Sequence, residues 1–312
     1  MERLHGLDAL RGMAALVVLA FHIGLIYGLE PIFPNGWLAV DFFFALSGYV
    51  LARTYEGRLR QSIGLWQFSK KRFFRFWPVV LFGGVIGAPW ILASNGPIDA
   101  IAIVALNVLL IPYFKGEDIF PLNGPYWSLF YEFVANVAHA FLLSRLDTRK
   151  LVVLVIACAI GMLFMGHSYG GLSFGTAPDT FAADFVRVTF SYGLGVLLYR
   201  VWQDKPPVKI LWPAAILLGS LALIGRGPFD GYMAQLSFVL AVVPLVIAGG
   251  LGWDTRLSGL GTLSFPLYAV HHPIVFYCAI SGLHPAIAVG FSLAAAALYV
   301  ALDKRFRFLK LE

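Results

Sequence analysis

The chain has 312 residues, of which 59% are hydrophobic and 13% are charged, and its formal net charge is +6. This composition excludes a water-soluble domain of the same length. The apolar residues form runs that leave no room for a separate soluble domain, so we predict a single membrane-embedded domain over residues 1–312. The runs cover residues 7–29, 37–52, 76–94, 98–113, 126–143, 151–166, 182–199, 210–224, 235–251, 263–281 and 285–302.

The first run is long enough to cross a bilayer and still contains three ionisable side chains. As a helix it would extend about 34 Å, at about 1.5 Å per residue. Asp8, Arg11 and His22 are spaced by three and then eleven residues, which places them on one helix face. Ionisable groups in membrane helices usually face the protein interior or a wet cavity, so this face is a candidate active-site wall. The alternatives are an interfacial ion pair of Asp8 with Arg11 and a neutral His22 bonded to a neighbouring helix.

The second run carries Asp41 near one end and the small pair Ser47-Gly48 deeper, where helices can approach closely. The stretch that follows, residues 53–75, holds seven basic residues and one acid. Short basic loops stay in the cytoplasm, so we expect this stretch and the N-terminus to be cytoplasmic. Cytoplasmic orientation and anionic membrane lipids account for such a loop, and we therefore predict no nucleic-acid binding.

Arg72 and Arg75 lie at the end of the basic stretch, among phenylalanines and Trp77. A spacing of three residues brings both guanidiniums to one helix face, where they can bind phosphates of a lipid or of a cofactor such as coenzyme A. Anchoring in the aromatic belt of the membrane is the alternative explanation.

The basic C-terminal end and the later basic segments fall on the cytoplasmic side if each later run crosses the membrane once. Residues 115–125 are then external, so one of the runs 76–94 and 98–113 cannot cross completely. The run 98–113 is the shortest and contains Asn107, so we predict that it is re-entrant or lateral; a break at residues 83–89 is the alternative. The predicted fold is an all-α polytopic membrane bundle of about ten transmembrane helices plus this re-entrant or lateral helix, with both termini cytoplasmic.

Polar side chains recur at two later places. The external segment brings Asn123, Trp127, Tyr131 and Glu132 to the mouth of the next run, at the level of His22, where a carboxylate and an imidazole can meet. Pairing of Glu132 with a structural arginine is the alternative.

The run 263–281 contains Tyr268, His271 and His272. Adjacent histidines point to different helix faces, and the chain has no CxxC or HExxH pattern, so we predict no metal site. Cys158 and Cys278 lie in separate apolar runs, which predicts buried free thiols.

Five segments together resemble acyltransferase family 3, a family of integral-membrane acyltransferases. They appear in the family's order and span nearly the whole chain, and in the first of them Arg11 and His22 are separated by ten residues. The last segment departs from the pattern, because Phe265 stands where tyrosine is common and Pro266 interrupts the pattern. The segments are GLDALRGMAALVVLAFHIG, VDFFFALSG, RFFRFWP, NGPYWSLFYE and LSFPLYAVHHP.

The resemblance implies transfer of an acyl group, usually acetyl, from cytoplasmic acyl-coenzyme A to a hydroxyl of a carbohydrate or lipid-linked acceptor, in a bacterial inner membrane. Arg72 and Arg75, with Arg11, would hold the phosphates of the cofactor, while its pantetheine arm follows the first helix toward His22. His22 would act as general base, or as the nucleophile that forms an acyl-histidine. The remaining expected site residues are Glu132 or Asp41 to orient the imidazole, Ser47 beside the cofactor, and Asn123, Trp127, Tyr131, Tyr268 and His271 on the acceptor side.

A multi-span transporter is the alternative function, in which the buried Asp, Arg, His and Glu side chains form a substrate or proton relay. The chain shows no internal inverted repeat, which favours the acyltransferase.

Overall fold

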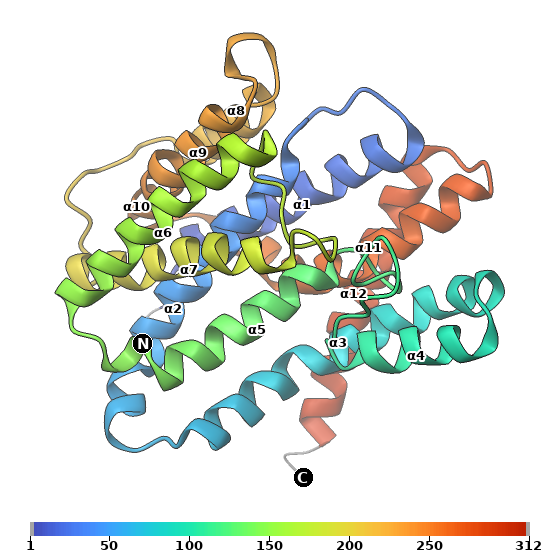
Figure 1. Cartoon of the computed structure of the whole chain (residues 1–312), viewed down its shortest axis with the longest axis horizontal. Coiled ribbons are helices and arrows are strands. Elements are labelled where there is room, and N and C mark those ends of the chain that lie inside the picture. The colour runs from blue at the N-terminus through green and yellow to red at the C-terminus, as the bar shows by residue number, and fades with distance from the viewer. Residues whose placement is uncertain (1–2, 310–312) are drawn as a thin grey trace.

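The computed structural model describes residues 3–309 of the chain, and its side chains up to Asp303. The described part is helical and contains no strand, so the predicted all-α bundle is confirmed (Figure 1). The helices are α1 (His5–Tyr27), α2 (Ala39–Gln61), α3 (Leu65–Ser94), α4 (Pro97–Val108), α5 (Tyr126–Phe141), α6 (Thr148–Tyr169), α7 (Phe181–Trp202), α8 (Pro213–Leu223), α9 (Tyr232–Ser237), α10 (Val243–Gly252), α11 (Leu260–Ile280) and α12 (Pro285–Leu309).

Each of the apolar runs forms a helix, but the helices differ in length. Within the described residues, eight segments are long and apolar enough to cross a membrane: α1, α2 with the turn before it, α3, α6, α7, α9 joined to α10, α11 with the turn before it, and α12. Of the ten expected crossings, α5 and α8 are shorter, with 16 and 11 residues. A full crossing takes about 20 helical residues, so these two are candidates for partial spans within the bundle.

The run 98–113 becomes the short helix α4, as expected for a segment that does not cross completely. It has 12 residues and folds back along α3 (Figure 1). The alternative of a break at residues 83–89 is wrong, because α3 continues through Pro78 and Pro89 without interruption. A membrane helix tolerates a proline when groups on neighbouring helices bind the backbone atoms that lose their partners. Here Tyr277 Oη of α11 accepts a hydrogen bond from the amide of Trp90, which follows Pro89, at 3.0 Å.

Two helix pairs organise the bundle: α1 packs on α11, and α2 packs on α7. The second pair depends on glycine, as the small pair Ser47-Gly48 predicted. A Cβ on Gly48 would overlap the carbonyl oxygen of Tyr192, and a Cβ on Gly195 would overlap that of Ala45. The two backbones are therefore in direct contact, which only glycine permits at these positions.

Replacing Gly195 with alanine should lower the unfolding temperature sharply and reduce the yield of monodisperse protein, because the two helices must separate to admit the new methyl group. Gly219 on α8 is the matched control, since a Cβ there meets no other atom within 4 Å. Thermal unfolding of the purified variants in detergent measures the difference. Equal unfolding temperatures for the two variants would show that the α2–α7 contact can adapt.

Candidate active site

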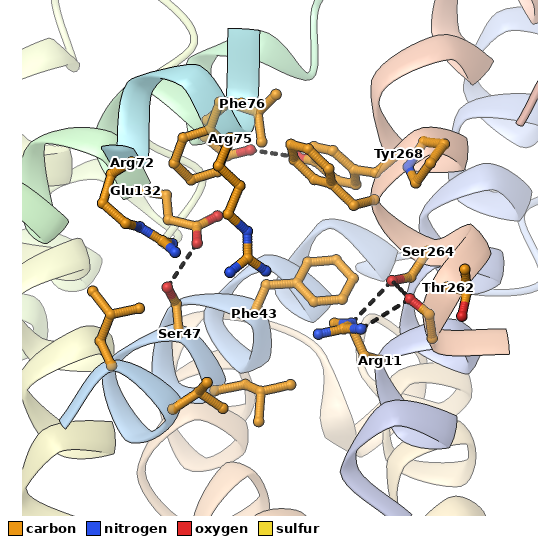
Figure 2. Close-up of a pocket in the computed structure, with 18 of the residues that line it drawn as sticks. Arg11, Phe43, Ser47, Arg72, Arg75, Phe76, Glu132, Thr262, Ser264 and Tyr268 are labelled. Carbon is orange, nitrogen blue, oxygen red and sulfur yellow. Dashed lines mark hydrogen bonds between the residues drawn. The ribbon is translucent and has the colours of Figure 1, made fainter. Parts of the chain in front are cut away.

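A cavity of about 820 Å³ lies among α1, α2, α3, α5, α11 and α12. This volume falls within the range of about 300–1,000 Å³ that is usual for ligand pockets. Figure 2 shows its side chains, with Arg72, Glu132 and Ser47 on one side and Arg11 with Ser264 on the other. Its polar lining includes Arg11, Ser47, Lys71, Arg72, Arg75, Ser128, Glu132 and Tyr268.

Arg72 and Arg75 reach this cavity from neighbouring turns of α3, as the sequence spacing predicted. Arg75 is exposed, whereas Arg72 is only 4% exposed and its Nε has no hydrogen-bond partner among the described residues. The guanidinium of Arg72 lies over the ring of Phe76, 5.4 Å from its centroid. A buried cation with an unused donor is costly unless an anion or water occupies the space beside it. The pair therefore suits an anionic ligand.

Glu132 and Ser47 join α5 to α2 within the cavity wall. Ser47 Oγ donates a hydrogen bond to Glu132 Oε1 at 2.6 Å. Arg11 occupies the opposite wall and joins α1 to α11: it donates to Ser264 Oγ at 3.0 Å and to the Gly261 carbonyl at 2.9 Å, and pairs with Asp8 at 3.0 Å. The proposed interfacial ion pair of Asp8 with Arg11 thus exists, and Arg11 still lines the cavity.

His22 lies beside the two histidines of α11. Its Nδ1 is 2.9 Å from the Val18 carbonyl oxygen and 3.2 Å from His271 Nε2, and the ring of His272 packs against it at 5.3 Å between centroids. His271 is fully buried, and its Nδ1 contacts the Leu267 carbonyl at 3.0 Å. Within the described part of the chain, these rings do not form a group arranged to hold a metal ion. The imidazole of His22 therefore faces the protein and is held by a second imidazole.

Tyr268 lies between the cavity and His271, and Phe43 packs against its ring. Both line the cavity; their rings are 5.7 Å apart, and the ring of Tyr268 is 5.9 Å from that of His271. Tyr268 is anchored by a 2.6 Å hydrogen bond between its hydroxyl and Ser128 Oγ. The described lining of the cavity includes neither His22 nor His271, so the passage that we expected from Arg72 to His22 ends at these two aromatic side chains.

The carboxylates expected to orient His22 have other partners, which corrects that prediction. Glu132 binds Ser47, and Asp41 is fully buried in an ion pair with Arg187 of α7, at 2.7 Å. Asp41 shares a helix face with residues that pack on α7, so its side chain points to Arg187 rather than to α1. The groups within hydrogen-bond distance of His22 Nδ1 are therefore the Val18 carbonyl and the imidazole of His271, and not a carboxylate.

Three of the residues expected on the acceptor side serve packing instead. Asn123 Nδ2 donates to the Ala269 carbonyl at 2.7 Å, and Tyr131 Oη donates to the Phe181 carbonyl at 2.7 Å. The ring of Trp127 lies over Arg187, at 5.5 Å. All three side chains are buried, and they are absent from the described lining of the cavity. Of the acceptor-side residues that we predicted, Tyr268 lines the cavity and His271 contacts His22.

Asp184 and Arg187 were missed in the sequence, although both stand in the apolar run 182–199. The rule that marked His22, an ionisable residue inside a membrane helix, applies to them equally. Arg187 contacts both Asp41 and Asp184 and lies between the rings of Trp37 and Trp127. Phe43 was also missed, because nothing in a run of phenylalanines distinguishes the one that closes a passage.

A family model described as an acyltransferase domain, that of acyltransferase family 3, matches residues 4–303. The chain is similar to "Protein 2 in picA locus" of Rhizobium radiobacter, with 34% identity over 53% of this chain and 94% of that protein. It is 24% identical to the putative membrane-bound transacylase BcsY of Komagataeibacter xylinus, over 87% of this chain and 73% of the relative.

A third relative is the O-acetyltransferase OatA of Staphylococcus aureus, which is 26% identical over 88% of this chain and 51% of its own length. The chain therefore spans about half the length of OatA. No solved structure matches the chain. The family model covers nearly all of the sequence, and the apolar helices are those of an integral membrane protein. The chain therefore belongs to acyltransferase family 3.

Proposed function

We propose that this protein is an acyl-coenzyme A-dependent O-acyltransferase of a bacterial inner membrane. It moves an acyl group, with acetyl as the expected one, to a hydroxyl of a carbohydrate or lipid-linked acceptor at the outer side of the membrane. Family membership and the likeness to relatives named as an O-acetyltransferase and a transacylase support acyl transfer. The basic stretch at residues 53–75 supports a cytoplasmic position for the arginine end of the cavity and for both termini.

The buried, unpaired Nε of Arg72 is the observation that carries this proposal. A phosphate supplies a charged acceptor oxygen for this Nε–H, and Arg75 and Lys71, on the same cavity wall, add two more cations. Coenzyme A carries phosphates at one end and its thioester at the end of a slim pantetheine arm. With the phosphates at Arg72, that arm occupies the apolar part of the cavity and extends toward Phe43 and Tyr268.

The transfer itself needs a base beside the thioester. His22 takes the proton of the acceptor hydroxyl, and the oxygen attacks the thioester carbonyl. The tetrahedral intermediate collapses with breakage of the carbon–sulfur bond, and the thiolate of coenzyme A leaves with the proton returned by His22. Tyr268 and Phe43 must move aside for the thioester to reach the imidazole, which is a conformational step of the cycle.

Replacing Arg72 with glutamine should weaken binding of coenzyme A by about 10- to 100-fold, because a charge-assisted hydrogen bond to phosphate contributes about 1.5–3 kcal/mol. Isothermal titration calorimetry on the protein in lipid nanodiscs measures the dissociation constant. Arg145→Gln is the control, since Arg145 is exposed, is absent from the described lining of the cavity, and contacts the carbonyl and the ring of Phe141. Unchanged affinity in the Arg72 variant, or no coenzyme A binding by the wild-type protein, would contradict the proposal.

Replacing Phe43 with alanine should speed the slow hydrolysis of acetyl-coenzyme A, in which water takes the place of the acceptor hydroxyl. The smaller side chain opens the closed end of the cavity toward His22. Release of free thiol, followed with a thiol-reactive dye, gives the rate. Phe164→Ala on α6 is the matched control and should leave the rate unchanged, because Phe164 is 67% exposed and is absent from the described lining of the cavity. A slower or equal rate for the Phe43 variant would mean that this ring does not obstruct the passage.

A further inference from the structure

The contact between His22 and His271 joins α1 to α11 through residues 249 positions apart in the chain. It belongs to a chain of three contacts: Leu267 carbonyl to His271 Nδ1 at 3.0 Å, His271 Nε2 to His22 Nδ1 at 3.2 Å, and His22 Nδ1 to the Val18 carbonyl at 2.9 Å. Both ends of this chain are backbone carbonyls, which can only accept hydrogen bonds.

The two carbonyls determine which ring nitrogens carry protons. Neither imidazole pairs with a carboxylate among the described residues, and burial without such a partner favours the neutral form, in which each ring has one N–H. The Leu267 carbonyl requires the proton of His271 to be on Nδ1, which leaves its Nε2 as an acceptor. His22 Nδ1 then faces two acceptors, Val18 O and His271 Nε2, and must itself carry the proton of that ring. The free lone pair of His22 is therefore on Nε2.

We infer that His271 is the positioning residue of the reaction, which holds His22 with Nε2 unprotonated and ready to accept the acceptor's proton. This inference rests on the proposed function, because it assigns a partner to the base. The position corresponds to that of the carboxylate in a Ser-His-Asp arrangement, which also fixes the tautomer of its histidine. Here the partner is a neutral ring whose own orientation is fixed by the Leu267 carbonyl.

A neutral partner has a consequence for the proton balance. When His22 Nε2 accepts the proton, the imidazolium keeps its Nδ1–H on His271 Nε2, and no proton needs to pass further along the chain. The proton returns from Nε2 to the thiolate of coenzyme A as the carbon–sulfur bond breaks. The hydrogen bond that His271 Nε2 accepts from the Nδ1–H of His22 thus becomes stronger as positive charge develops on His22, and it weakens again when the product forms.

The first test compares His271→Ala, His271→Gln and His272→Gln by hydrolysis of acetyl-coenzyme A in nanodiscs. We expect His271→Ala to lower kcat by about 100-fold with KM unchanged, because the base loses its orientation but the phosphate end of the cavity does not change. His271→Gln keeps an acceptor oxygen near Nδ1 of His22 and should recover at least part of the lost rate. His272→Gln is the control, because His272 packs on His22 through its ring and its substitution leaves the chain of contacts intact.

The outcomes separate this inference from the proposed function. If His22→Gln abolishes hydrolysis but His271→Ala behaves like His272→Gln, the positioning role is refuted while the acyltransferase stands. If the wild-type protein neither binds nor hydrolyses acetyl-coenzyme A, the proposed function itself fails.

A second measurement does not depend on the folding of any variant of His271. Nitrogen-15 NMR of histidine-labelled wild-type protein reports the tautomer of each ring, and the signals missing from His22→Gln identify those of His22. A protonated Nδ1 with an unprotonated Nε2 supports the inference, and the opposite tautomer overturns it.

Discussion

Replacing His22 with glutamine is expected to lower the hydrolysis of acetyl-coenzyme A by at least about 100-fold, the typical contribution of a general base. Binding of coenzyme A should be unchanged, because His22 is absent from the described lining of the cavity that holds Arg72 and Arg75. Thiol release and calorimetry on the same preparation measure the two quantities. A loss of rate without a loss of affinity is the signature of a group that acts on the reaction rather than on cofactor binding.

The exposed His167 of α6 supplies the control for this substitution, since its ring packs only at the surface against Tyr232. His167→Gln should keep the wild-type rate. A His22 variant that also keeps the wild-type rate would exclude both the general base and the acyl-histidine form of the mechanism.

Replacing Arg187 with methionine is expected to have the largest effect on stability. Arg187, Asp41 and Asp184 are all fully buried, and Arg187 is the only cation in contact with the two carboxylates among the ion pairs of the described residues. Ser191 Oγ also donates to Asp41, at 2.8 Å. Removing one partner of a buried ion pair usually costs about 3–5 kcal/mol, because a charge remains without compensation. We expect a large fall in unfolding temperature and little recoverable protein.

Asp184→Asn is the matched control for Arg187→Met. Two carboxyl groups contact one guanidinium, and Asp184 Oδ2 has no hydrogen-bond partner in the described part of the chain. Neutralising Asp184 leaves the Asp41–Arg187 pair balanced, so stability should change little. The double variant Asp41→Asn/Arg187→Met should recover part of the loss of the single one, as removal of a complete buried pair costs less than breaking it. A single Arg187 variant as stable as the wild-type protein would show that the carboxylates are protonated in the fold.

The buried charges also explain how α2 and α7 are held in register. Glycine contacts bring the two backbones together near Gly48 and Gly195, and the ion pair of Asp41 with Arg187 lies further along the same interface. Because lipid tails are as apolar as the side chains they contact, the hydrophobic effect does not drive two helices together inside a membrane. Close backbone contact and satisfied polar groups stabilise the α2–α7 interface instead. Substitutions at either place should therefore affect stability before they affect catalysis.

The sequence by itself determined the membrane bundle, the short helix near residues 98–113, and the helix faces that carry polar groups. These features depend on local quantities: the length of an apolar run sets whether a helix can cross, and the helical period sets which residues share a face. The spacing of Arg72 and Arg75 thus correctly placed both on one cavity wall. The position of His22 inside an apolar run made it a candidate, and its role as base stays a prediction.

Only the tertiary structure decided which helix each of those faces meets. Asp41 was expected beside His22, but its partner is Arg187, 146 residues later in the chain, and the partner of His22 is His271. The same holds for Phe43 and Tyr268, which close the cavity because α2 and α11 bring their rings together. The periodicity of one helix fixes the direction of a side chain relative to its own axis, whereas the group it meets depends on how distant helices pack.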